Sequence, residues 1–245
     1  VYIGWNAGAD ADAATVNAVY NTYIGTESGR YLDDGTHNTA IGYNAMRSTD
    51  ADAQNANNNV AVGTYALLAI TDGDNNVAVG SHAGVALTIG VDNTALGFHS
   101  LFTEDVGNRS VALGSYALYS QNSNVDNEVT GNIGVGYASG YHNVEGTNNT
   151  YIGYTAGQGA TGENNSYNVG MGYKSLFAIT TGGYNVAIGS NTGIALTTGV
   201  YNSFLGYSVG QALVSGNANI ALGFESLDEH IKTTKSLSLN IDIIG

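Results

Sequence analysis

The stretch Asn59-Val-Ala-Val-Gly63 recurs as Asn76-Val-Ala-Val-Gly80 and, slightly changed, as Asn93-Thr-Ala-Leu-Gly97. The closing glycines of this motif stand at positions 4, 25, 42, 63, 80, 97, 114, 136, 153, 172, 189, 206 and 223. Eight of the 12 intervals are 17 residues long. A repeat this short cannot bury its own apolar residues, so stacked copies must share one core. The sequence therefore predicts an all-β parallel β-solenoid of about 13–14 rungs, in which one rung is one repeat.

The motif alternates with period two, which separates its side chains onto two faces. The residue before the closing glycine is aliphatic in all 13 copies, and the residue two before it is usually Ala. We place the larger residues inside, so Val62, Val79, Leu96 and Leu113 are expected in the core and the alanines outside. A second apolar run, such as Val85-Ala-Leu-Thr88, is expected to form a second strand in each rung.

Asn opens the motif in 11 of 12 copies, with Ser110 as the exception, and is expected to form a ladder of amides. The four longer intervals place extra residues near 9–20, 48–58, 120–131 and 158–166. These stretches are rich in small polar residues, so we expect them to bulge out as loops while the rungs keep register. The solenoid is expected over 1–228, followed by a C-terminal segment, 229–245, that is a degenerate last rung, a cap or a joint.

Composition excludes several classes of function. The chain of 245 residues has a formal charge of −14, with 6 Lys+Arg against 20 Asp+Glu, which disfavours nucleic-acid binding. It has no Cys and no apolar stretch long enough to span a membrane. Neither His nor Asp follows a metal-binding pattern, so no metal and no cofactor is expected. Gly206-Tyr-Ser-Val-Gly210 matches a nucleophile elbow, but all its residues occupy repeat positions, so we expect no enzyme.

Aromatic residues follow the closing glycine in eight copies of the motif. Their faces could stack on sugars, or the rings could stack on one another along the solenoid. The candidates for receptor contact at this position are Tyr43, Tyr137, Tyr154, Tyr173 and Tyr207.

The string Asn38-Thr-Ala-Ile-Gly-Tyr-Asn-Ala45 resembles the YadA-like head repeat of trimeric autotransporter adhesins and the related repeats of phage tail-fibre proteins. The resemblance covers about residues 1–228. It implies a left-handed parallel β-roll in which three chains lie side by side, with an adhesive or receptor-binding role. Alanines repeated on an outer face would also let parallel chains approach closely, so a parallel homotrimer is expected.

The leading functional hypothesis is a structural and adhesive fibre segment, a virion tail fibre that attaches to a glycan or protein of the host surface. The alternatives are the head of a bacterial trimeric surface adhesin and a self-assembling filament subunit. All three imply an extracellular location. A surface-binding solenoid such as an ice-binding protein would need a uniform outward rank of Thr, and a polysaccharide lyase would need a basic cluster; neither is present in the sequence.

Overall fold

The structure, a computed structural model, describes residues 1–9, 19–32, 34–48, 55–162, 164–227 and 237–239. The chain forms two compact units, Val1–Gly131 and Asn132–Gly245, named here the N-terminal and the C-terminal unit. Every regular element within the described residues is a β-strand, and none of those residues is helical. The predicted all-β class is confirmed.

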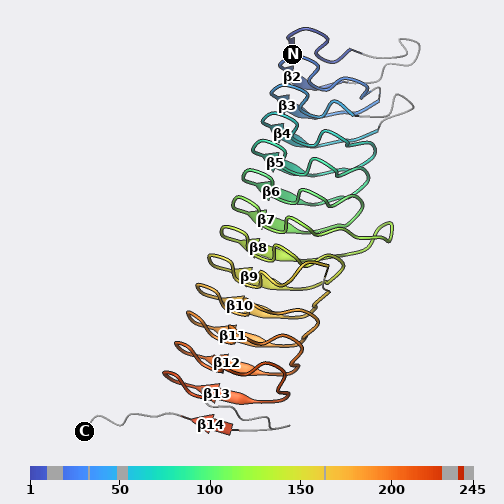
Figure 1. Ribbon diagram of the computed structural model, residues 1–245. Coiled ribbons are helices and arrows are strands. Elements are labelled where there is room, and N and C mark those ends of the chain that lie inside the picture. Colours follow the sequence, from blue (N-terminus) through green and yellow to red (C-terminus); the bar gives the residue numbers. More distant parts are fainter. Residues whose placement is uncertain (10–18, 33, 49–54, 163, 228–236, 240–245) are drawn as a thin grey trace. The chain divides into compact units, whose positions relative to one another are not determined.

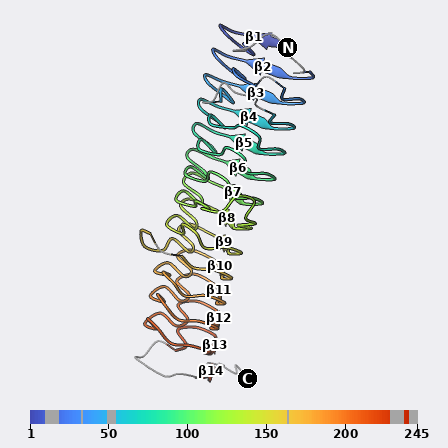
Figure 2. The ribbon, with the colours of Figure 1, turned by 90° about the vertical axis from the view of Figure 1, so that its right-hand side faces the viewer.

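Within the described residues, each unit contains seven short strands that run parallel in chain order (Figures 1 and 2). The N-terminal unit contains β1 (Tyr2–Ile3), β2 (Thr22–Ile24), β3 (Thr39–Ile41), β4 (Val60–Val62), β5 (Val77–Val79), β6 (Thr94–Leu96) and β7 (Val111–Leu113). The C-terminal unit contains β8 (Ile133–Val135), β9 (Thr150–Ile152), β10 (Val169–Met171), β11 (Val186–Ile188), β12 (Ser203–Leu205), β13 (Ile220–Leu222) and β14 (Leu237–Leu239). Equal motif positions pair throughout each unit, as Ala61 does with Ala78 and Ala78 with Ala95. The parallel β-solenoid is therefore confirmed.

The longer intervals leave the register unchanged. Strands β3 and β4 are separated by a 21-residue interval, yet Ala40 still pairs with Ala61. The loop prediction holds only in part, because Ala56 and Ser123 are buried whereas Asp126 is exposed. The inserted stretches 10–18 and 49–54 lie outside the described residues.

The expected second strand of each rung is wrong for the described residues, which hold one three-residue strand per complete rung and turns elsewhere. The second and fourth residues after the closing glycine have left-handed backbone, as at His82 (φ 58°) and Gly84 (φ 56°). This conformation curls the chain instead of extending it. Hydrogen bonds still join successive rungs here, such as the 3.2 Å bond from the Ala69 N–H to the Val85 carbonyl.

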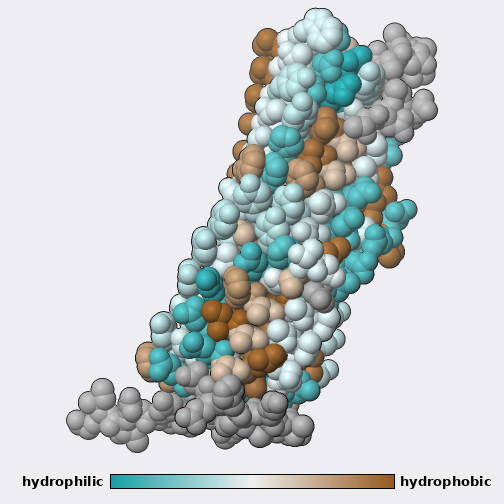
Figure 3. All heavy atoms as spheres, in the orientation of Figure 1, coloured by the Kyte–Doolittle hydropathy of each residue, from teal (hydrophilic) through white to brown (hydrophobic). Residues whose placement is uncertain are grey.

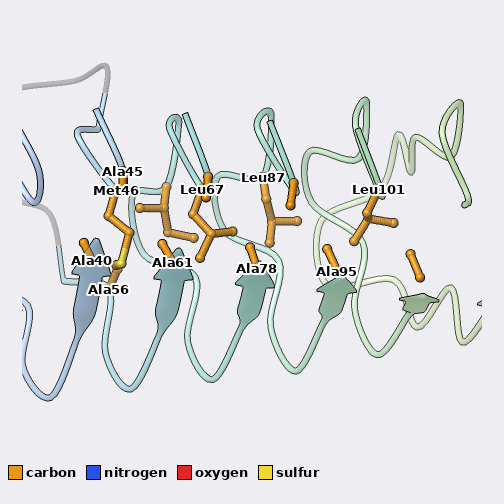
Figure 4. Close-up of a cluster of buried hydrophobic side chains, with 14 of the residues drawn as sticks. Ala40, Ala45, Met46, Ala56, Ala61, Leu67, Ala78, Leu87, Ala95 and Leu101 are labelled. Carbon is orange, nitrogen blue, oxygen red and sulfur yellow. The ribbon is translucent and has the colours of Figure 1, made fainter. Parts of the chain in front are cut away.

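The two faces of the strand are reversed relative to the sequence prediction. The strand-middle alanines, among them Ala78, Ala95 and Ala112, are at most 2% exposed. Ala78 and Ala95 point into the core (Figure 4). Leu96 is instead 48% exposed. Val62, Val79 and Leu113, also expected inside, are only half-buried. The solenoid prediction was right, but the assignment of large residues to its core was wrong.

The reason is the narrow cross-section of each rung. Leu or Met, four residues after the glycine, fills the core opposite a strand-middle Ala, as Leu67 and Leu101 do (Figure 4). Where the strand middle is aromatic, the opposite residue is Gly. A Cβ on Gly29 would lie 2.5 Å from the Tyr23 ring, and one on Gly210 would lie 3.1 Å from the Phe204 ring. Close packing leaves no room for a large residue at both positions. Gly84 and Gly193 stand opposite alanines, and there a Cβ would lie 3.0 Å from a leucine of the preceding rung, Leu67 or Leu176.

The predicted amide ladder is confirmed and lies inside the solenoid. The Asn185 Oδ1 accepts a 3.0 Å bond from the Asn202 N–H, and its Nδ2 donates to the Gly199 carbonyl at 2.8 Å. Equivalent bonds begin at Asn59 and at Asn76 in the N-terminal unit. Each amide thus satisfies backbone groups that burial would otherwise leave unpaired.

The ladder changes at Ser110, and a buried polar cluster takes its place. Glu104 and Gln121 occupy the position that Leu87 fills in a regular rung, and both are fully buried. The Gln121 Nε2 donates to the Glu104 Oε2 at 2.6 Å and to the Ser110 Oγ at 2.8 Å. The Glu104 Oε1 accepts from the Gly107 N–H at 2.7 Å. The cluster pairs its buried polar side chains with one another and with backbone N–H groups.

Candidate functional surface

The outward face of the C-terminal sheet is apolar and uncharged. The outward residues of β10–β13 are Val169, Met171, Val186, Ile188, Ser203, Leu205, Ile220 and Leu222. The large ones among them reach exposures of 55% at Ile220 and 49% at Leu205. Parallel sheets usually have both faces covered, and exposed apolar patches of this kind mark interaction sites. Apolar patches are also visible between hydrophilic residues on the side displayed in Figure 3.

Three of the predicted contact tyrosines form one stacked rank along an edge of this face. The ring centroids of Tyr137 and Tyr154 lie 5.4 Å apart, and those of Tyr154 and Tyr173 lie 5.7 Å apart, with 14° between the planes in both pairs. Tyr207 stacks on Phe224 at 5.3 Å. The tyrosines are about half exposed, but their faces lie against one another. Stacking on sugars is thus restricted to the ends of each rank.

The fifth candidate, Tyr43, belongs to the N-terminal unit and has different surroundings. It is 47% exposed and meets Tyr65 edge-on at 75°, with centroids 5.4 Å apart. Partial burial, together with Tyr43, raises the pKa of the Tyr65 phenol. The structure therefore does not bring Tyr43 into a parallel rank like those of the C-terminal unit.

Tyr65 belongs to a cluster of aromatic rings, named here the aromatic corner, which also contains His82, Phe98, His99 and Phe102. His82 lies 4.9 Å from Tyr65 and 5.0 Å from His99, measured between ring centroids. The His99 ring stacks on Phe98 at 3.9 Å and on Phe102 at 4.5 Å. Burial, and to a lesser degree His82, lowers the pKa of His99, so the corner favours a neutral imidazole.

Sequence reasoning missed a second rank, formed by Tyr167, Tyr184 and Tyr201. Each precedes a ladder Asn, and they are 48%, 51% and 60% exposed. Ring centroids are 4.8 Å apart in the first pair and 5.1 Å in the second, with interplanar angles of 7° and 21°. The signal was available, because Tyr stands before the Asn in three consecutive repeats.

Several acidic side chains of the described residues bond to backbone groups of the solenoid. No group of three or more His, Cys, Asp or Glu there could hold a metal ion. The Asp74 Oδ1 accepts the Asn57 N–H at 2.7 Å, so this carboxylate caps a neighbouring rung. Ser208, the nucleophile of the apparent elbow, is buried at a turn with no helix after it.

Among the residues whose placement is described, no helix is long and apolar enough to cross a membrane. No known protein family, no curated protein and no solved structure matches the chain.

Proposed function

We propose that the chain is a structural and adhesive segment of an extracellular fibre, a virion tail fibre that acts as a parallel homotrimer and contacts the host surface. The observation that carries the proposal is the uncharged outward face of the C-terminal sheet. In a chain with 26 charged residues, 20 acidic and 6 basic, an apolar face of this regularity favours a covered surface over a solvated one. The repeat resemblance supports the same assignment.

The contact between copies differs from the one expected from the sequence. Ala78, Ala95 and Ala112 are buried and cannot meet a second chain. The half-exposed aliphatic residues on either side of them supply the contact instead. Parallel copies place each rung opposite the same rung of the next chain, and a cyclic arrangement closes the assembly. We assign the chain no catalytic role.

Oligomeric mass tests this contact. Ile188→Lys combined with Leu205→Lys puts two charges on the outward face without altering any inward position. Light scattering should give the mass of three chains for the wild type and one chain for the double variant. A matched control, Thr181→Lys with Thr198→Lys, alters exposed residues outside the strands and should remain a trimer. A wild-type mass of one chain would overturn the homotrimer.

Location is tested on the source material. Antibodies raised against the chain should label thin fibres on virions in electron micrographs. Host attachment should also fall when the purified chain is added as a competitor. Labelling confined to cell surfaces would contradict the virion location and favour the bacterial adhesin. If the added chain did not reduce attachment, the proposed adhesive role would be wrong.

A further inference from the structure

The rank of Tyr167, Tyr184 and Tyr201 combines three properties that the other surface residues do not share. The rings are exposed, nearly parallel and closer together than those of any other tyrosine rank in the described residues, at 4.8 and 5.1 Å. Their phenol rings occupy equivalent positions in consecutive rungs. Each ring therefore has a second phenol of the same orientation beside it.

The backbone holds these rings in place. The Tyr184 N–H donates to the Ser166 carbonyl at 3.2 Å, and the Tyr201 N–H donates to the Gly183 carbonyl at 3.2 Å. The residue that follows each tyrosine is a buried ladder Asn, fixed on both sides. The backbone positions of neighbouring tyrosines thus stay adjacent, which gives their phenols a high effective concentration.

The choice of tyrosine at this position has a conformational cost. Tyr167, Tyr184 and Tyr201 have left-handed backbone, with φ of 60°, 57° and 59°. Asn and Asp adopt that region readily, and the N-terminal unit uses Asn75 and Asp92 there. Tyr20 and Arg109 have the same backbone conformation at this repeat position, so the three tyrosines are set apart by standing in consecutive rungs with stacked rings.

We propose that this rank is an oxidative cross-linking site, at which adjacent tyrosines of one chain are joined as dityrosine. The oxidant is of the haem peroxidase class and uses hydrogen peroxide. Each of two phenols gives up one electron and one proton, and the two radicals join through the ring carbons ortho to their hydroxyls. The hydrogen on each joined carbon then moves to the oxygen, which restores both phenols. Two tyrosines and one hydrogen peroxide give one carbon–carbon bond and two waters.

The bond would connect residues 17 positions apart and fasten one rung covalently to the next. A chain without Cys cannot form disulfides. The cross-link therefore supplies what disulfides supply in other extracellular proteins. It is independent of the homotrimer, because both partners belong to one chain.

The test treats the full chain with horseradish peroxidase and hydrogen peroxide and identifies linked peptides by mass spectrometry. The Tyr167–Tyr184 and Tyr184–Tyr201 pairs should account for most of the dityrosine, and Tyr184→Phe, which keeps the stacked ring, should remove at least nine-tenths of it. Tyr154→Phe is the matched control in the other rank and should leave both pairs unchanged. Assemblies mixed from isotopically light and heavy chains should give links within one label. Links mainly between labels, or an unchanged yield in Tyr184→Phe, would overturn the proposal.

Discussion

The N-terminal and C-terminal units have the same core but different edges. In both, the closing glycine is constant and the ladder residue is Asn with the same contacts, except at Ser110. Just before the ladder, three consecutive rungs of the N-terminal unit have Asn58, Asn75 and Asp92, whereas three consecutive rungs of the C-terminal unit have Tyr167, Tyr184 and Tyr201. Tyr20 is the one tyrosine that the N-terminal unit has at this position. Aromatic rings of the N-terminal unit meet at an edge or tilted as well as stacked, whereas those in the C-terminal ranks stack in parallel.

The difference between the two edges indicates which repeat positions are restricted by packing against neighbouring rungs. An inward residue contacts the rungs on both sides, so a change there affects three rungs at once. An outward residue contacts solvent or a partner, so it can vary between the units. If this explanation is correct, inward substitutions must cost the same in both units, and only outward ones can differ in effect.

The closing glycine should give the largest effect. In Gly80→Ala the new Cβ would lie 2.6 Å from the Gly97 carbonyl oxygen, and in Gly172→Ala it would lie 2.5 Å from that of Gly189. Both glycines also have φ near +130° (137° and 130°), where an L-residue is strained. Each variant should lose about 5 kcal/mol of unfolding free energy or fail to fold. Urea denaturation at one protein concentration measures this.

Gly162→Ala is the control for that experiment, since a Cβ there meets nothing within 4 Å. It should lose only about 1 kcal/mol, from the positive φ alone. A large loss in one unit and a small one in the other would break the claim that the two cores are equivalent.

The ladder should give the next largest effect. Asn76→Ala removes the acceptor of the Asn93 N–H and the donor to Gly90, and Asn185→Ala does the same to Asn202 and Gly199. Two buried groups left unpaired should cost about 2–4 kcal/mol in either unit. Hydrogen exchange should show the loss of protection at Asn93 or Asn202, and Thr198→Ala, at an exposed site, serves as the unaffected comparison. Retained protection would show that water replaces the amide.

The polar cluster sharpens the comparison, because it occurs in the N-terminal unit at a position that is apolar in regular rungs. Glu104→Leu leaves the Gly107 N–H, the Ser123 N–H and the Gln121 Nε2 without this acceptor, so a loss of about 2 kcal/mol is expected by urea denaturation. Adding Gln121→Leu should recover part of it, because an aliphatic pair matches Leu87 of a regular rung. A double variant less stable than the single one would show that the cluster has no apolar equivalent.

The smallest effect concerns pH, and here the two units should behave alike. Burial lowers the pKa of His99 in one unit and of His142 in the other. The unfolded chain therefore binds more protons below about pH 6.5, so stability falls as the pH drops from there toward the lowered pKa values. The combined variant His99→Asn and His142→Asn should reduce this dependence, measured by thermal unfolding at about pH 7 and about pH 5.5. If the variant's stability changed with pH as the wild type's does, groups other than His99 and His142 would be responsible for the proton uptake.

Spacing alone predicted the rungs, the parallel pairing and the ladder, because each depends on a repeat that one sequence displays. The prediction of which strand face points into the core was wrong. The two-residue alternation places Ala78 and Val79 on opposite faces, but it does not show which face is inside. The ladder could have decided it: Asn76 and Ala78 share a face, and an amide that bonds buried backbone must point inward. The residues opposite the strand, such as Leu67 and Gly29, also indicated which strand face is inside, because Leu67 accompanies a strand-middle Ala and Gly29 accompanies a strand-middle Tyr.

The stacked rings of Tyr167, Tyr184 and Tyr201 could be located from the sequence, but their exposure and parallel planes could not. Both depend on the left-handed backbone before the ladder, which a tyrosine does not suggest. The aromatic corner around His99 was equally hidden, because its rings come from three separate repeat positions.

The amide ladder also bears on how such a chain changes over generations. Each ladder Asn binds only its own rung and the adjacent ones, so the upper and lower surfaces of successive rungs are interchangeable. An in-frame duplication or deletion of one repeat outside the Glu104–Gln121 cluster would join two surfaces whose ladders match. The length of the solenoid can therefore be altered by recombination in whole repeats while every remaining rung keeps its structure.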